Sequence, residues 1–229
     1  MDLFTRDVTR TSHLERSFIV QRRGMAFLAA MFPVTFLVSS FVFGRTEFQT
    51  SISAYYWTLD LERNVFVGVL CAIAVFLLLY KGYNWLEDRV LDVAGVAAAG
   101  VAFFPTHEFG DCTSLGVSAH GVLAVIFFAC IFFICIFMSE HTLKEITEPR
   151  RQAMFRRAYR LCSGVIVASV ALAVLSRFLP DAYVQALCEN GAVFWLEAVG
   201  VWAFSAFWYI KTRELDPSLS WVPLRRKRS

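Results

Sequence analysis

The chain has 229 residues, of which 57% are apolar and 18% are charged, and its formal net charge is +3. So high an apolar content excludes a disordered chain and argues strongly against a soluble protein. The small positive charge is no sign of nucleic-acid binding, because the basic residues lie beside apolar stretches, and we expect no nucleic-acid partner.

Six apolar stretches follow one another along the chain. They cover residues 24–44, 64–83, 91–105, 119–138, 161–179 and 192–210. About 20 helical residues cross the hydrocarbon layer of a bilayer, so each stretch predicts a transmembrane helix. The third is short and needs its polar flanks or local thinning of the bilayer. The predicted fold is an all-α membrane bundle of six helices, with a basic segment at 1–23, a transmembrane domain at 24–212 and a mobile basic tail at 213–229.

The basic residues predict the orientation of this bundle. Nineteen of the 22 Lys and Arg residues fall before the first stretch, after the last, or in the second and fourth connections. The other side receives Arg45, Arg63 and Arg177. Since cytoplasmic segments retain Lys and Arg, both termini should be cytoplasmic, and we expect the protein in a bacterial inner membrane in contact with its lipids.

Two further segments carry structural predictions. The third stretch is rich in Ala and Gly between residues 94 and 102, which lets helices approach closely and favours a place in the bundle centre. The connection 142–160 contains Pro149 and a basic cluster. It fits either a helix on the membrane surface, broken near Pro149, or an extension of the fifth transmembrane helix.

Polar side chains gather toward the outer side and predict a small pocket there. The candidates are Ser51, Ser53, Tyr55, Tyr56, Asp60, Asn64, His107, His120 and Glu197. Glu197 is the most informative, because an ionisable residue inside a span turns inward toward a partner. We expect His120 and Glu197 to face one another at similar depth, below a roof formed by residues 51–60. The alternatives for Glu197 are a structural hydrogen bond between helices and exposure in an outer, water-filled vestibule.

Metal and disulfide chemistry are weaker expectations. His107 and His120 are weak candidates for a metal, but the chain has no HExxH pattern and we expect no cofactor. Cys112 and Cys188 fall in different outer loops and can form a disulfide if that side is oxidising.

Several runs carry a family resemblance. They are Ser51-Ile-Ser-Ala-Tyr-Tyr-Trp-Thr, Arg63-Asn-Val-Phe-Val-Gly68, Tyr80-Lys-Gly-Tyr83, Phe104-Pro-Thr-His107 and Ser118-Ala-His-Gly-Val-Leu-Ala-Val-Ile-Phe-Phe128. Over about residues 50–130 the chain resembles uncharacterised bacterial six-helix membrane proteins of a domain-of-unknown-function family. The start of the fourth stretch is also loosely similar to Frag-type, DRAM-like membrane proteins. Neither resemblance implies an established activity.

Three classes of function stay open. The absence of catalytic motifs favours a non-enzymatic protein that uses its outer pocket for sensing, for binding lipid, or for assembly with a protein partner or a second copy of itself. The second class is a membrane-embedded hydrolase or lipid-modifying enzyme, with or without a metal, using His107, His120 and Glu197. The third is a proton-coupled transporter using Glu197, which is weakened by the lack of discontinuous helices, of repeats and of further charges deep within the membrane.

Overall fold

The computed structural model describes residues 2–82, 84–106, 118–144, 146 and 148–215, and the side chains of 2–16, 188 and 215 are not described. All the regular structure in these ranges is helical. The elements are α1 (Asp2–Leu37), the π-helix η1 (Val38–Val42), the 3₁₀-helix η2 (Ser53–Trp57), α2 (Asp60–Leu79), α3 (Trp85–Phe103), α4 (Ala119–Phe133), the π-helix η3 (Ile134–Met138), α5 (Ser139–Leu143), α6 (Pro149–Ser176), α7 (Asp181–Glu189) and α8 (Ala192–Leu215). The all-α prediction is confirmed.

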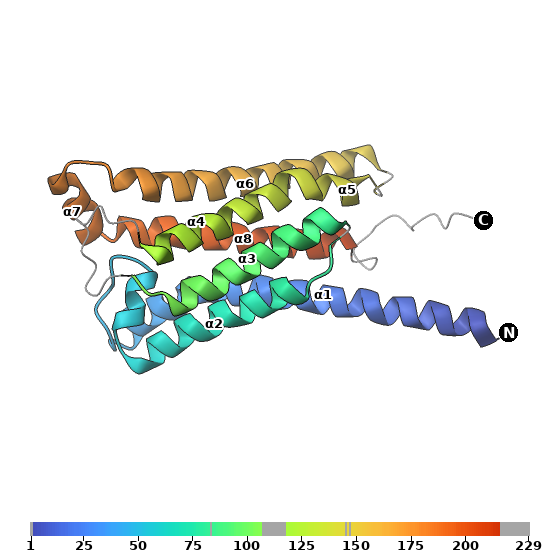
Figure 1. Cartoon of the computed structure of the whole chain (residues 1–229), viewed down its shortest axis with the longest axis horizontal. Helices are drawn as coiled ribbons and strands as arrows, with labels where there is room; N and C mark the ends of the chain where they lie inside the picture. Colours follow the sequence, from blue (N-terminus) through green and yellow to red (C-terminus); the bar gives the residue numbers. More distant parts are fainter. Residues whose placement is uncertain (1, 83, 107–117, 145, 147, 216–229) are drawn as a thin grey trace.

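The long helices lie side by side, and α1 and α8 run antiparallel. The Arg22 side chain donates to the carbonyl oxygen of Lys211 at 3.0 Å, and the Ser205 hydroxyl donates to that of Ala26 at 2.6 Å. The start of α1 and the end of α8 therefore lie at one end of the bundle, which we call the terminal end. The short helices α7 and η2 lie at the opposite end, the α7 end (Figure 1).

Five helical segments are long and apolar enough to cross a membrane. They are Ser17–Val42, Asp60–Leu79, Ala119–Leu143, Pro149–Ser176 and Ala192–Glu214. The helix α3, expected as the third span, is not among them. Its 19 residues carry Glu87, Asp88, Arg89 and Asp92 in the first two turns, which leaves only a short apolar remainder.

The small residues of α3 do allow close packing, as expected. A Cβ atom at Gly95 would come within 3.0 Å of the Ala74 carbonyl oxygen on α2, so only glycine permits this approach. The opposite face of α3 is exposed, with Val96 62% accessible. The helix therefore lies at the edge of the bundle, and the expectation of a central place is wrong.

The connection 142–160 is mostly an extension of the fifth transmembrane helix. The helix α6 begins at Pro149 and runs without a break to Ser176. Proline suits the first turn of a helix, where its missing N–H has no helical partner, so Pro149 starts the helix. Phe155 and Tyr159 in this extension are buried in the core.

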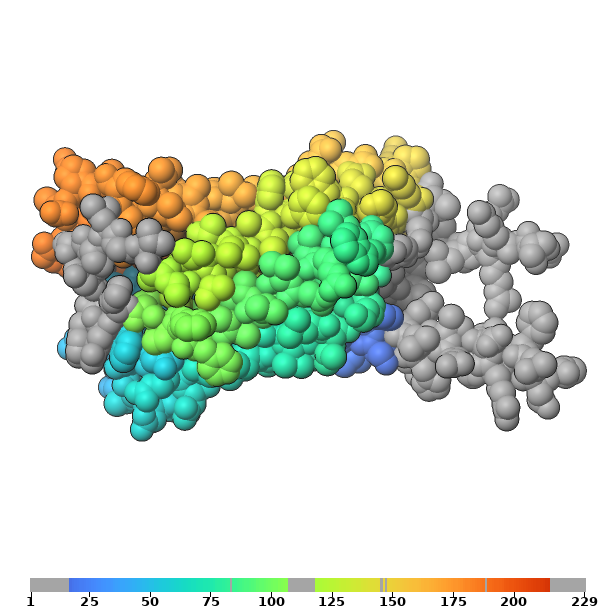
Figure 2. Space-filling model, in the orientation of Figure 1, coloured from blue at the N-terminus to red at the C-terminus, as the bar shows by residue number. Residues whose placement is uncertain are grey.

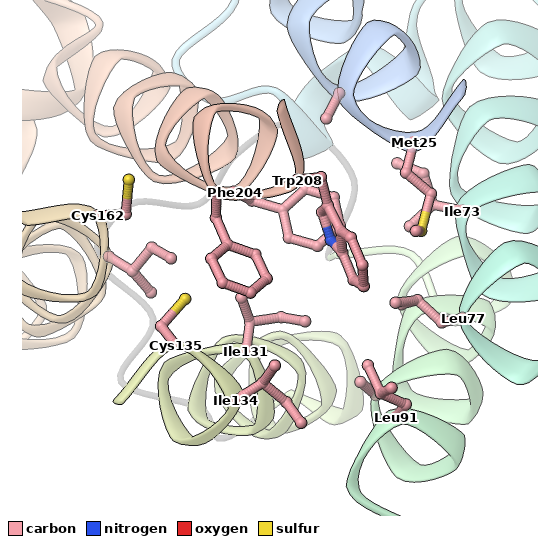
Figure 3. Close-up of a cluster of buried hydrophobic side chains, with 14 of the residues drawn as sticks. Met25, Ile73, Leu77, Leu91, Ile131, Ile134, Cys135, Cys162, Phe204 and Trp208 are labelled. Carbon is pink, nitrogen blue, oxygen red and sulfur yellow. The ribbon is translucent and has the colours of Figure 1, made fainter. Parts of the chain in front are cut away.

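The largest cluster of buried apolar side chains fills the bundle on the side toward the terminal end. Ile131 and Ile134 belong to it together with Leu77, Phe204 and Trp208 from other helices (Figure 3). This cluster matters for the site because it separates the interior of the α7 end from the terminal end.

Candidate functional site

A cavity of about 590 Å³ opens into the α7 end of the bundle. Its walls come from α1, α2, α3, α4, α6 and α8, and residues Thr50 to Ala54, which form the loop before η2 and the start of η2, contribute to it. A volume in this range is typical of sites that hold a small molecule. The walls are mainly apolar: Phe32, Phe66, Leu70, Ile73, Val101, Val125, Phe127, Val170, Val174, Leu196 and Phe204 are among the residues that line it.

One side of the cavity lies between α4 and α6. These two helices converge near α5 and separate toward α7 (Figure 1). Val122 and Val125 of α4, with Val174 of α6 and Phe178 just after it, line the cavity and are also exposed on the outside of the bundle. Figure 2 shows this face, with α4 beside α6. In a bilayer, such exposed apolar residues would contact acyl chains, and this side of the cavity would then lie against lipid.

Polar groups of the cavity gather at the α7 end, where Glu197 holds the loop before η2. A carboxylate oxygen of Glu197 accepts a hydrogen bond from the backbone N–H of Ile52 at 2.6 Å. Ile52 is the N-cap residue immediately before η2, and the first N–H groups at a helix start have no partner within the helix. The Phe194 N–H also donates to the Thr50 carbonyl oxygen at 2.8 Å. The second turn of α8 therefore fixes this loop over the cavity.

The hydroxyls of Ser51 and Ser53 lie beside this anchor. Their oxygen atoms are 3.1 Å apart, and Ser51 also accepts from the N–H of Ala54 at 3.1 Å. Both residues line the cavity. They therefore offer hydroxyl groups close to the carboxylate of Glu197.

His120 lies in the first turn of α4 and lines the same cavity. Its Nδ1 atom is 3.0 Å from the carbonyl oxygen of Phe104, and its ring stacks on that of Phe66. A carbonyl oxygen only accepts, so Nδ1 carries a proton and donates it to this bond. Glu197 and His120 thus share one cavity, each with its own backbone partner.

The other sequence candidates lie elsewhere or outside the described residues. Tyr55 is fully buried and bonds to Ser40 at 2.7 Å, while Tyr56 packs under Arg63. Asp60 and Asn64 are exposed on α2, and none of these four lines the cavity. His107, Cys112 and the side chain of Cys188 fall outside the described part of the chain. Within that part, no three His, Cys, Asp or Glu residues gather as metal ligands do.

Sequence reasoning missed two groups of buried charge. At the α7 end, Glu62 is buried and accepts hydrogen bonds from Ser39 at 2.5 Å and from Arg45 at 3.2 Å. At the terminal end, Arg22 and Lys211 are buried. From the sequence, the basic residues among them are interpreted only as signals of membrane orientation, although each lies within two residues of the end of an apolar stretch.

Five apolar spanning helices around a largely apolar cavity define a helical integral membrane protein. Over residues 53–202 the chain matches a protein family described as a protein of unknown function (DUF998), and the chain belongs to this family. The match extends the resemblance of residues 50–130 toward the C-terminus, while the similarity to Frag-type, DRAM-like proteins is not shown. Comparison with curated proteins and with solved structures found no match.

Proposed function

We propose that this protein binds an amphiphilic molecule, such as a lipid, which enters the cavity from the membrane between α4 and α6. The observation that carries the proposal is the cavity's division into an apolar body and a polar end. Its long walls are apolar, whereas Glu197, His120, Ser51 and Ser53 all line it toward the α7 end. An amphiphile has the same division, because its chain gains from leaving water and its head requires hydrogen bonds.

The proposal includes six spans with both termini in the cytoplasm of a bacterial cell. Two arguments support it: α1 starts and α8 ends at the same end of the bundle, which requires an even number of crossings, and α3 lies beside α2 and α4 as a sixth helix. The charges in the first turns of α3 lie near the terminal end, where they can reach headgroups. The cavity is then on the outer side.

Photocrosslinking tests the binding proposal. The purified protein in bilayer nanodiscs would receive a fatty acid carrying a diazirine in its chain, and labelled peptides would be mapped by mass spectrometry. We expect saturable labelling on the parts of α4 and α6 that line the cavity. Substitution Ala173→Phe places a ring in the cavity and should lower this labelling roughly tenfold, the effect of about 1.4 kcal/mol of lost binding energy.

A matched control lies two residues away on the same helix. Ala171 does not line the cavity, so Ala171→Phe should leave the saturable labelling unchanged. Labelling that does not saturate, or that covers every lipid-facing helix equally in all three proteins, would overturn the proposal. A diazirine phosphatidylethanolamine used in parallel distinguishes a single-chain ligand from a two-chain one.

A further inference from the structure

The terminal end of the bundle holds a second set of polar side chains, which we call the terminal cluster. Its members are Arg22 of α1, Tyr80 after α2, Thr142 of α5, Tyr159 of α6, and Lys211 and Glu214 of α8. Arg22 and Lys211 are each only 3% exposed, and the Glu214 side chain is 2% exposed. One buried cluster thus joins five parts of the chain that are distant in sequence.

Hydrogen bonds and one ion pair connect the cluster. The guanidinium group of Arg22 donates to the Tyr80 hydroxyl and to the Lys211 carbonyl oxygen. The Lys211 ammonium group lies 3.1 Å from Glu214 and donates to the Thr142 hydroxyl. Tyr159 donates to Glu214 at 2.6 Å. These contacts close the bundle at this end.

Some polar atoms in and beside the cluster lack a hydrogen-bond partner among the described residues. Among the residues that the structure describes, Arg22 Nε, Glu214 Oε1 and the neighbouring Trp208 Nε1 are buried and find no hydrogen-bond partner. Buried polar atoms almost always have a partner, and each exception needs an explanation. A cluster that served only as a rigid plug has no reason to retain two unpaired groups beside a third on Trp208.

A permanent seal would also be simpler to build from apolar residues. Replacing a buried ion pair with apolar side chains is often neutral or stabilising. Lys211 lies about one turn from the end of α8 and has a stem long enough to reach the headgroups, yet it is buried. Charges retained in such a place are best known for specifying one arrangement among several, or for switching between arrangements.

The position of the cluster complements that of the cavity. The cavity lies toward the α7 end, the apolar cluster of Figure 3 fills the bundle next to it, and the terminal cluster closes the far end. We propose that the terminal cluster is a gate, and that the protein is a carrier which passes its amphiphile along the bundle when this gate separates. The identity of the transported molecule rests on the function proposed above, whereas the existence of the gate does not.

Native cysteines report on the gate. Cys135 of η3 and Cys162 of α6 are buried in the apolar cluster beside the terminal cluster. Purified protein in nanodiscs would be treated with a maleimide in increasing urea, and the labelling rate at each cysteine would be read by peptide mass spectrometry. A gate opens without global unfolding, so we expect Cys135 to react at a rate that hardly depends on urea.

Variants distinguish a gate from a plug. Tyr159→Phe removes one hydrogen bond of Glu214 and should raise the Cys135 labelling rate at least roughly threefold, as expected for the loss of about 0.7 kcal/mol. Lys211→Met combined with Glu214→Leu replaces the ion pair by apolar side chains and should lower the rate below that of the unmodified protein. Arg156→Gln breaks a half-exposed pair with Glu140 at the same end and should change nothing.

Two results would overturn the gate. One is a Cys135 labelling rate that follows global unfolding in urea in every variant. The other is an unchanged rate in Tyr159→Phe with global stability retained. Because no ligand is added, either result leaves the crosslinking test of the cavity unaffected. A failed crosslinking test would exclude the proposed amphiphile but not the gate.

Discussion

Glu197 combines both of the roles that its sequence position allowed. It lines the cavity, and its carboxylate is also a structural acceptor for the N–H of Ile52. The hydrogen bond crosses from α8 to the loop before η2 and joins residues 145 positions apart in the sequence. A carboxylate is the strongest acceptor among the side chains for such an N–H, which gives the residue a physical reason to be acidic.

Replacement of Glu197 by leucine should destabilise the protein. The change leaves the partly buried N–H of Ile52 without an acceptor, and a lost partner of this kind costs about 1–3 kcal/mol. Thermal unfolding in mild detergent measures the effect. Glu197→Gln keeps an acceptor oxygen and should lose less than half as much. Equal stability of the leucine variant and the unmodified protein would contradict this assignment.

At the scale of secondary-structure elements, small residues determine how closely α2 and α3 pack. Gly95 allows the two backbones to approach, since an added Cβ would lie 2.7 Å from Leu78 Cγ and 3.0 Å from the Ala74 carbonyl oxygen. In lipid, where helices gain little from burying apolar surface, such close contact is a principal source of association. Gly95 is therefore a packing residue of the fold.

We expect Gly95→Ala to lower stability by about 1–3 kcal/mol, because α2 and α3 must move apart to accept the methyl group. The matched control is Gly68→Ala on α2, where an added Cβ meets no atom within 4 Å. It should raise stability by up to about 1 kcal/mol through its better helix propensity. Denaturation in a mixed detergent series gives both values, and equal effects at the two glycines would refute the packing argument.

The outer loops carry a prediction that the described residues do not test. If Cys112 and Cys188 form a disulfide, it ties the second outer loop to α7 and so to the start of α8. Protein from an oxidising compartment, alkylated and run without reductant, should then migrate differently from its Cys112→Ser variant. Free thiols at both positions in that protein would exclude the bond.

At the scale of the whole molecule, the charge distribution predicts which end faces the cytoplasm. A reporter that is active only in the cytoplasm, fused to either terminus, should be active in both fusions. The reason is the cost of translocation, since reversed insertion would carry nearly all of the 22 Lys and Arg residues across the membrane. Activity at one terminus alone would exclude six spans with both termini inside.

The whole-molecule arrangement also changes how the basic residues are understood. Arg22 and Lys211 fit the positive charge bias of their end, yet both are buried between helices. One argument against a carrier is the lack of further charges within the spans. This argument is wrong, because Glu62, Arg22 and Lys211 are all buried in or next to spanning segments.

The sequence by itself determined the helical class, the apolar segments other than α3 that are long enough to span a membrane, and the inward position of Glu197 and His120. These features follow from local composition, since about 20 apolar residues in a row have few alternatives to a membrane helix, and a lone carboxyl within them has to turn inward. Local composition also placed Ser51 and Ser53 near that carboxyl.

Only the tertiary structure decided which polar residues share a cavity and which pair elsewhere. Tyr55, Asp60 and Asn64 lie near Ser53 in the sequence, but the turn of η2 and the face of α2 direct them away from it. The terminal cluster could not be predicted from the sequence for the same reason. Its partners, such as Arg22 and Tyr80 or Tyr159 and Glu214, are separated by more than fifty residues, and only the packing of helices brings them into contact.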